Sequence, residues 1–446
     1  MAISSQPESS PSGRRSGISR RLLITAAAST LLAATAACGS AVNTTTGSSP
    51  DGLITLSMHN PDSKTQDPAT WHLVQAFNAQ HPDMRIKLEG QLVDQHEQRM
   101  TIAAQSGTLP EIFWVYDSLA KTMAKNGDLL NLTTILAEND LQAKFTPSML
   151  AAFQSGNVQY GVPYQALVTG FYYNKDILRA HGLAVPRTFE DLLAAVKKLK
   201  AAGVVPIAQG ANTSSFSVWA FLTMLDRFGY EEKYQDILSG RARYDNADFV
   251  RLYQHVEELA KAGAFPANMN TQTYPQAVAS YTAGKAAFLD AGVWEAHKIQ
   301  DSKVGRSTGF WAGPTFSDGV GEQNLVMNVP SAPFVVSAKV KEDKKKYAAV
   351  KAFLQFYYSD AGQKILVDNG QPPVTTYKPQ VDAAKDPVFA AVLAEAARPG
   401  WKSPKAQPDL VVSAATASAM YDSFYGVMGG SLSPQEAAAK VQKSIK

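Results

Sequence analysis

Residues 160–210 read YGVPYQALVTGFYYNKDILRAHGLAVPRTFEDLLAAVKKLKAAGVVPIAQG, and this stretch decides the fold. Its run from Leu167 to Tyr173 is rich in β-branched and aromatic residues over the length of a strand. Thr188, followed three residues later by Asp191, predicts a capping box at the start of a helix. Gly203 lies where a helix-terminating glycine is expected, and a short apolar strand resumes directly after it. The stretch therefore predicts strand, helix and strand in succession, which is typical of an α/β fold.

The chain on either side repeats this alternation. Residues 54–58 alternate apolar and polar side chains, a helix with one apolar side follows over about 71–82, and residues 84–88 alternate again. This order predicts a parallel sheet with a right-handed crossover. Residues 112–115 form a further buried strand, and strands and helices continue to alternate to about Gly313.

Four short motifs within this stretch carry a family resemblance. They are Gly161-Val162-Pro163-Tyr164, Tyr173-Asn174-Lys175-Asp176, Pro186-Arg187-Thr188-Phe189-Glu190-Asp191-Leu192, and Gly203 with Pro206-Ile207. In this order and spacing the chain resembles the extracellular sugar-binding proteins of bacterial ABC importers, the family that includes maltose-binding protein. The resemblance implies a two-lobe, periplasmic-binding-protein-like fold of class II with the ligand cleft between the lobes. It places one lobe at 53–165 plus 314–357 and the other at 167–311 plus 360–446.

The N-terminal residues have the order of an exported lipoprotein. A basic segment precedes an apolar run at 22–37, which predicts a signal peptide over 1–38. Residues 31–39 resemble a bacterial lipobox, which implies lipidation of Cys38 and an anchor at the extracellular face of the cell membrane. The small and polar residues 39–52 predict a flexible tether. The alternative is a discarded leader in which Cys38 has no role.

Charge and composition exclude several classes of protein. The four arginines and one glutamate of residues 1–38 account for the net charge of +3, so the remaining chain is neutral and has no basic face for nucleic acid. The single cysteine excludes an internal disulfide and a multi-cysteine metal site. No nucleophile elbow, zinc-protease motif or phosphate-binding loop is present, so we expect no enzyme, no metal and no cofactor. A pair of carboxylates for glycoside hydrolysis stays open, because its members need only meet in space. After the leader, no stretch is apolar enough to span a membrane.

Aromatic and polar side chains that follow the predicted strands are the candidates for ligand contact. A sugar offers apolar ring faces and hydroxyl edges, so its pocket needs flat aromatic platforms beside hydrogen-bonding groups. The ends of strands at the cleft are where an α/β sheet holds such groups. The candidates are Asn60, Asp62, Asp117, Tyr164, Gln165, Asn212, Ser215, Trp219, Asp290, Trp294, Asn328 and Trp401. By the resemblance, the region of Asp117 presents polar groups to the sugar, and Trp294 aligns with a stacking residue of the family.

Each candidate also has a structural interpretation. Asp62 and Asp117 could cap helices, Tyr164 could be a hinge residue, and Trp219 could pack under a sheet. The remaining tryptophans, Trp71, Trp114 and Trp311, are expected in the core. The resulting expectation is a monomeric binding protein that closes over a mono- or oligosaccharide and delivers it to an ABC transporter permease. A secreted carbohydrate-active enzyme, or the same fold binding a non-sugar solute, remains the alternative.

Overall fold

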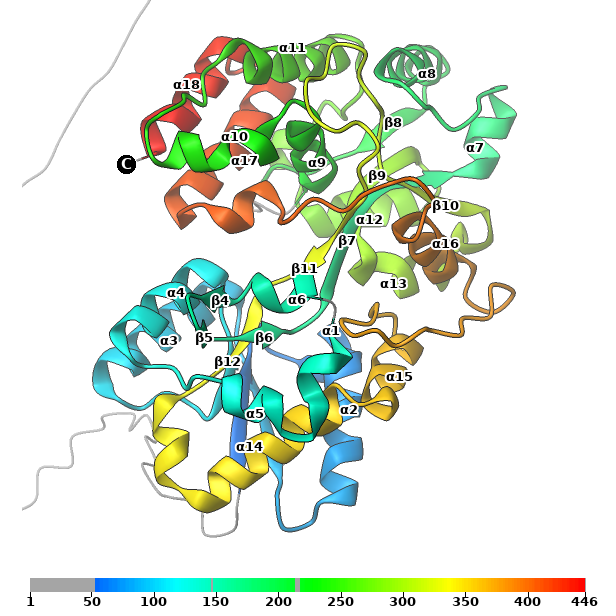
Figure 1. The fold of residues 1–446 in the computed structure, drawn as a ribbon. Coiled ribbons are helices and arrows are strands. Elements are labelled where there is room, and N and C mark those ends of the chain that lie inside the picture. Colours follow the sequence, from blue (N-terminus) through cyan, green and yellow to red (C-terminus); the bar gives the residue numbers. More distant parts are fainter. Residues whose placement is uncertain (1–52, 146, 213–216, 446) are drawn as a thin grey trace, which may run out of the picture. The chain divides into compact units, whose positions relative to one another are not determined.

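The first sheet forms from the alternating apolar residues near the start of the globular chain. The computed structural model describes residues 53–145, 147–212 and 217–445 (Figure 1). The predicted signal peptide, Cys38 and the tether lie outside them. The strands run in the order β2-β1-β3-β12-β6, with β1 parallel to β2 and β3, and β12 antiparallel to β3 and β6. They are β1 (Ile54–Met58), β2 (Ile86–Gly90), β3 (Ile112–Trp114), β6 (Val162–Pro163) and β12 (Pro333–Val336).

Helices cover both faces of this sheet. Alternate residues of β3 enter different cores, because successive side chains of a strand point to opposite faces. Ile112 and Trp114 join the core beneath α2 and α14, whereas Phe113 joins the core beneath α3 and α4. The elements of this lobe are α1 (Ser63–Gln66), α2 (Pro68–Gln80), α3 (Val93–Ser106), α4 (Asp117–Asn126), α5 (Thr133–Ala137), α6 (Pro147–Ala151), β4 (Gln154–Ser155), β5 (Val158–Gln159), α14 (Lys344–Tyr357) and α15 (Asp360–Asp368).

The second sheet is built around the long strand β7 (Ala166–Asn174). Its order is β10-β7-β9-β8, with β11 also paired to β7, and only β8 and β9 are parallel. Phe171 and Tyr172 of β7 enter cores on opposite faces. The other elements are α7 (Lys175–Ala180), α8 (Phe189–Ala201), β8 (Val205–Ala208), α9 (Trp219–Arg227), α10 (Tyr230–Leu238), α11 (Ala247–Lys261), α12 (Tyr274–Thr282), β9 (Ala286–Gly292), α13 (Ala296–Gln300), β10 (Thr308–Trp311), β11 (Met327–Pro330), α16 (Pro387–Ala396), α17 (Ala414–Met428) and α18 (Pro434–Ser444).

The local signals that start and stop α8 are confirmed. The Thr188 side chain accepts a hydrogen bond from the backbone N–H of Asp191, and the Asp191 carboxylate accepts one from the backbone N–H of Thr188, so the capping box is complete. Gly203 follows the helix with φ of +75°, a left-handed conformation that favours glycine. Both signals act within a few residues, which is why they could be read from the sequence. The prediction of a two-lobe α/β fold is also confirmed.

Two chain segments pass between the lobes together. β6 ends at Pro163 and β7 begins at Ala166, while β11 ends at Pro330 and β12 begins at Pro333. The two segments are antiparallel partners on both sides of the break. Within the break, the backbone N–H of Ser331 donates to the carbonyl of Gln165 at 2.9 Å. Each of these two connections is therefore two residues long, and the Ser331–Gln165 hydrogen bond joins the pair.

The lobe boundaries expected at 314 and 360 are wrong. Residues 314–330 belong to the second lobe, because Phe316 is buried in its core and β11 pairs with β7. Residues 360–374 belong to the first lobe, because α15 packs against α2 and α14, and Leu366 and Val374 are buried in its core. The chain thus returns to the first lobe at 331–332 and leaves it again after Val374.

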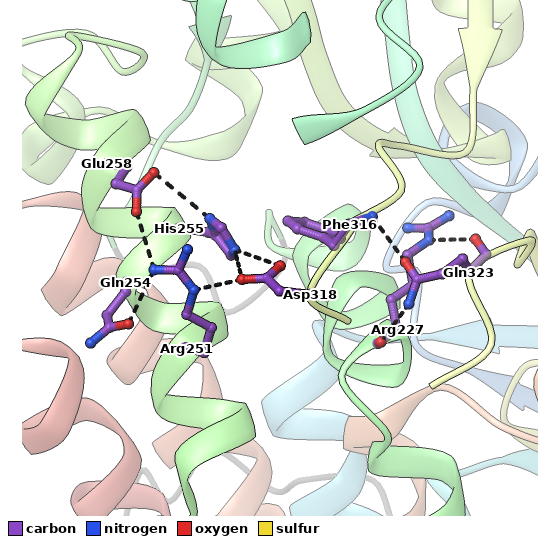
Figure 2. Close-up of polar contacts among 8 residues, drawn as sticks. All are labelled: Arg227, Arg251, Gln254, His255, Glu258, Phe316, Asp318 and Gln323. Atoms are coloured by element: carbon purple, nitrogen blue, oxygen red, sulfur yellow. Dashed lines mark hydrogen bonds and ion pairs between the residues drawn. The ribbon is translucent and has the colours of Figure 1, made fainter. Parts of the chain in front are cut away.

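A buried arginine fixes the loop between β10 and β11 on the second lobe. Arg227, at the end of α9, is 0% exposed and donates to the carbonyls of Ala312 and Leu325 at 3.1 and 2.7 Å. It also donates to the carbonyl of Gln323 at 3.0 Å (Figure 2). Gln323 in turn donates to the carbonyl of Arg227 at 2.8 Å. Burial lowers the pKa of Arg227 to about 10, so the guanidinium keeps its charge at neutral pH. These long-range bonds explain why the boundary at 314 could not be read from the local sequence.

A second contact holds the same loop to α11. Asp318 accepts hydrogen bonds from Arg251 at 2.6 Å and from His255 at 3.0 Å (Figure 2). The His255 ring is buried against Phe189 and Phe316, with ring centroids 4.2 and 5.2 Å apart. The loop is thus attached at both ends before the chain enters β11.

None of the helices in the described part of the chain combines the length and the apolar character that a membrane span requires.

Candidate functional site

Three aromatic rings meet at the end of β9 in the second lobe. β9 runs into a short 3-10 turn, Val293–Glu295, which carries Trp294, while Trp219 and Tyr274 are the first residues of α9 and α12. The ring centroids of Trp219 lie 4.7 Å from Trp294 and 5.3 Å from Tyr274, at interplanar angles of 67° and 75°. The indole N–H of Trp294 donates to the Tyr274 hydroxyl at 3.0 Å. The three rings therefore hold one another in place.

The exposure of these rings differs in a way that bears on function. Trp219 is 7% exposed, whereas Trp294 is 37% exposed. A large aromatic surface that stays accessible, although its ring is held by neighbours, is suited to stack on an apolar ligand face. The Trp219 ring packs edge-on against the Trp294 ring. The structure thus brings together two of the predicted residues, and Tyr274 adds a third that sequence reasoning missed.

Asp290 lies in β9, two residues before the strand ends at Gly292. It is 0% exposed, and its Oδ1 accepts a hydrogen bond from the backbone N–H of Ala220 at 2.9 Å. Within the described part of the chain, its Oδ2 has no hydrogen-bond partner. Burial raises the pKa of Asp290 to about 8, so the carboxyl group is mostly protonated at neutral pH. The contact fixes the first turn of α9, and with it the position of Trp219.

Asp117 lies in the first lobe at the start of α4. It is 8% exposed, accepts a hydrogen bond from the Tyr160 hydroxyl at 2.7 Å, and pairs with Lys121 at 2.6 Å. Asp117 is the first residue of the helix and not its cap, which is Tyr116. The interpretation of Asp117 as the helix cap is therefore wrong, and its contact with a ligand stays a prediction.

A cavity of about 360 Å³ adjoins Asp117 and is lined by residues of both lobes. The first lobe contributes Asp117 and Lys121, the crossing segment contributes Ser331, and the second lobe contributes Tyr234 and Lys405. These side chains supply both hydrogen-bond donors and hydrogen-bond acceptors. The cavity can therefore hold a small polar molecule.

The edge of the first sheet carries a second aromatic and polar group. The His59 ring, just after β1, stacks on Trp114 with centroids 4.1 Å apart, and Trp114 is 5% exposed. Burial lowers the pKa of His59 to about 3, so the ring is neutral. Glu97 accepts a hydrogen bond from the backbone N–H of Tyr116 at 2.8 Å, and burial raises the pKa of Glu97 to about 7. Trp114 is thus a packing residue, as expected.

Tyr164 is buried at the first connection between the lobes. It is 2% exposed, and its hydroxyl donates to Asp67 at 2.5 Å. Gln371 donates to the same carboxylate at 2.9 Å, and the Tyr357 hydroxyl donates to the Tyr164 carbonyl at 2.7 Å. These contacts favour the interpretation of Tyr164 as a hinge residue over direct ligand contact. Gln165 next to it is half-buried, and its carbonyl joins the two crossing segments.

The other predicted residues, apart from Ser215, lie at several different places in the described part of the chain. Asp62 is exposed and accepts a hydrogen bond from the Thr65 hydroxyl at 2.7 Å. Asn212 donates to the Thr271 carbonyl at 3.3 Å, and the Trp401 ring lies 4.0 Å from the Arg398 guanidinium. Asn60 is half-buried after β1, and Asn328 is half-buried within β11. Ser215 lies outside the described residues.

The residues that sequence reasoning missed had weak local signals. Tyr274 follows the Thr273 cap of a helix with a complete capping box, which marks a helix start and not a ring-stacking residue. Lys121 was visible only as the partner of Asp117 four residues earlier, a common pair on helix surfaces. Tyr234 and Lys405 come from distant parts of the chain and meet only in the folded protein. Among the described residues, no group of three or more His, Cys, Asp or Glu is placed to hold a metal ion.

Comparison with known proteins gives one family and one fold. The family described as bacterial extracellular solute-binding protein matches residues 61–364. The multiple sugar-binding protein of Streptococcus mutans is 23% identical over 339 residues, which are 72% of this chain and 76% of that protein. The sn-glycerol-3-phosphate-binding periplasmic protein of Brucella melitensis is 23% identical over 288 residues, which are 61% of this chain and 63% of that protein.

Among solved structures, a chitin oligosaccharide binding protein has a TM-score of 0.76 at 23% identity, and the match covers 87% of this chain and 97% of that chain. The matched segments span between 43% and 76% of the length of the curated relatives. At this level of identity the structural likeness establishes the two-lobe fold. The match of the family over more than half of the chain establishes the family.

Proposed function

Because this chain belongs to the family of bacterial extracellular solute-binding proteins, we propose that it captures a carbohydrate and delivers it to the permease of an ABC importer. The names of relatives support a sugar, since one is a multiple sugar-binding protein and a structural neighbour binds chitin oligosaccharides. Another relative is an ABC transporter extracellular-binding protein, which supports the importer. The protein acts as a monomer that binds its solute and does not convert it.

The observation that carries this proposal is the accessible ring of Trp294. It is 37% exposed although Tyr274 bonds its N–H and Trp219 packs beside it. The C–H face of a pyranose can stack on such a platform, while the hydroxyls at its rim need hydrogen-bond partners. We propose that the polar side chains that line the cavity are these partners: Asp117 and Lys121 of the first lobe, and Tyr234 and Lys405 of the second.

Hinge closure is the proposed mechanism of capture. Two short paired connections and the longer segment after Val374 join the lobes, so a change of backbone angles at 164–165 and 331–332, followed by this longer segment, turns one lobe relative to the other. A sugar that touches both lobes binds the closed form more tightly than the open form and shifts the population towards it. The permease then recognises the closed form.

A thermal-shift screen tests the solute class. Chitotriose, xylotriose, maltotriose and galactose are added to the purified protein, and sn-glycerol 3-phosphate is added in a parallel arm. A ligand that binds only the folded state at about 100 times its Kd stabilises it by about 2.7 kcal/mol, which raises the melting temperature measurably. We expect at least one neutral sugar to do so. A shift with the phosphate alone would refute the carbohydrate proposal.

The phosphorylated solute is the second candidate, for a specific reason. Lys121 and Lys405 line the cavity, and the Brucella relative binds sn-glycerol 3-phosphate. Lys121 is already paired with Asp117, however, which reduces its attraction for an anion. A secreted carbohydrate-active enzyme is the remaining alternative. Incubation of the protein with the same oligosaccharides should leave them intact, and the appearance of shorter products by chromatography would establish an enzyme.

The membrane anchor is part of the proposal. Lipidation of Cys38 would hold the protein at the extracellular face of the cell membrane, with residues 39–52 as the tether. Cells that express the protein can be labelled with radioactive palmitate and fractionated. We expect label in the membrane-bound protein and none in the Cys38→Ala variant; equal labelling of both would exclude this cysteine.

A further inference from the structure

The glycine that precedes the Trp294 turn is not required by its own backbone. Gly292 has φ of −116° and ψ of −176°, an extended conformation that any residue adopts. Its backbone contacts are ordinary for the end of a strand: it pairs with Thr169 of β7, and its carbonyl accepts a hydrogen bond from the Tyr172 hydroxyl at 3.0 Å. The reason for a glycine at this position must therefore be the space around it.

That space is filled by the indole of Trp294. A Cβ atom on Gly292 would lie 2.1, 2.2 and 2.6 Å from Cζ3, Cη2 and Cε3 of the Trp294 ring. Cβ atoms do not approach other heavy atoms below 3.0 Å in proteins. The six-membered part of the indole thus lies directly against the Gly292 backbone, and no residue with a side chain leaves room for it.

Two further neighbours hold the ring in place. Its N–H is bonded to the Tyr274 hydroxyl at 3.0 Å, and Trp219 packs against it with a centroid distance of 4.7 Å. A methyl group at position 292 would have to displace the ring until its nearest atom, now 2.1 Å from the added Cβ, lies at least 3.0 Å away. That shift would break the bond to Tyr274 or separate the two indoles.

We propose that Gly292 is a positioning residue that sets the place and tilt of the Trp294 platform. Strand backbone, Tyr274 and Trp219 together fix the ring before any sugar arrives. A platform that is fixed in advance loses little conformational entropy on binding, which favours affinity. The part of this inference that concerns sugar binding rests on the proposed function, whereas the position of the ring does not.

The first test needs no ligand. The variants Gly292→Ala, Trp294→Ala and the double variant are compared with the parent protein by urea unfolding. We expect Gly292→Ala to lower the unfolding midpoint of the parent protein and to leave that of the Trp294→Ala protein unchanged, because the colliding atoms are then absent. If Gly292→Ala alone fails to fold, the double variant should fold. Equal losses in both backgrounds, or failure of both to fold, would overturn the proposal.

A spectroscopic signature separates positioning from mere stability. The six tryptophans are labelled with 5-fluorotryptophan, and the Trp294 resonance is assigned by its absence from Trp294→Phe. In Gly292→Ala this resonance should move and gain solvent exposure. Gly309→Ala is the matched control, since its Cβ would lie 2.2 Å from the Tyr173 ring of the same sheet. It should destabilise the protein and leave the Trp294 resonance in place; an unmoved Trp294 resonance in Gly292→Ala would refute the inference.

The third test measures sugar binding. Its ligand is whichever of chitotriose, xylotriose, maltotriose and galactose gives the largest thermal shift. Gly292→Ala should weaken its binding roughly ten-fold, as Trp294→Ala does, and the double variant should bind no more weakly than Trp294→Ala. A further loss in the double variant would show that Gly292 acts by another route. If no sugar binds, the proposed function fails, while the unfolding and fluorine results still decide the role of Gly292.

Discussion

The buried carboxyl group of Asp290 predicts a dependence of stability on pH that a single isosteric change should abolish. Its pKa is raised from 3.8 to about 8 because the folded protein removes it from water. Unfolding between these pH values therefore releases a proton. The contribution of Asp290 to stability is complete below its unfolded pKa and is lost as the pH rises through the folded pKa. Asp290→Asn keeps an oxygen for the N–H of Ala220 and cannot ionise.

The size of the effect follows from proton linkage. Each pH unit between the two pKa values costs about 1.4 kcal/mol of stability, so the loss between about pH 5 and pH 7 is about 2.5 kcal/mol. The Asn variant does not suffer this loss. The difference in unfolding free energy, variant minus parent, should therefore increase by about 2.5 kcal/mol over this range. Titrations of all other groups cancel in the difference.

Urea unfolding followed by circular dichroism at pH 5, 6 and 7 measures this difference. Asp245→Asn is the control, because a hydrogen bond from Arg243 lowers the pKa of Asp245 and both its folded and unfolded states are ionised above pH 5. Its difference from the parent should stay constant. A constant difference for Asp290→Asn as well would show that Asp290 is ionised in the folded protein and that the burial argument is wrong.

Three further predictions follow from contacts described above. Trp294→Ala should weaken sugar binding by about 1–3 kcal/mol in isothermal calorimetry, whereas Trp311→Phe, a change in the core, should not; equal affinities would exclude Trp294 from the site. Tyr164→Phe should lower the unfolding free energy by about 1–3 kcal/mol, because a buried carboxylate loses a donor, and a stability equal to the parent's would contradict that bond. Arg227→Met removes the donor from two buried carbonyls and one half-buried carbonyl and should cost at least about 3 kcal/mol. Arg251→Met, on a half-exposed ion pair, should cost less than about 1 kcal/mol, and similar urea midpoints for both variants would refute this ranking.

The parts of the fold that could be predicted from the sequence are those that depend on residues close to one another in the chain. The capping box at Thr188, the glycine that ends α8 and the alternation in residues 54–58 each depend on neighbours within a few positions. The lobe boundaries depend on distant ones. Nothing in the sequence of residues 314–330 shows that Arg227 donates to the carbonyls of Gln323 and Leu325, so the sequence alone predicts the wrong lobe for this segment.

The candidate site shows the same division. Trp219 and Trp294 could be selected because each follows a strand, and the structure brings their rings together. Tyr164 also follows a strand, yet its hydroxyl is bonded to Asp67, which lies 97 residues earlier in the chain. Whether an aromatic side chain faces a cleft or a buried carboxylate depends on which distant segment lies opposite, and a single sequence does not encode that in any local pattern.

The two paired connections at 164–165 and 331–332 are too short to change their length. Because residues 164–165 and 331–332 are bonded to each other and run between ordered strands, the proposed hinge motion would turn the lobes about this pair and would not separate them along it. A pair of fluorescent labels, one on each lobe, would therefore report an angle and not a translation. Adding a residue to one connection alone would throw its strand out of alternation with its partner, so insertions here must be matched on both chains to keep the sheets in register.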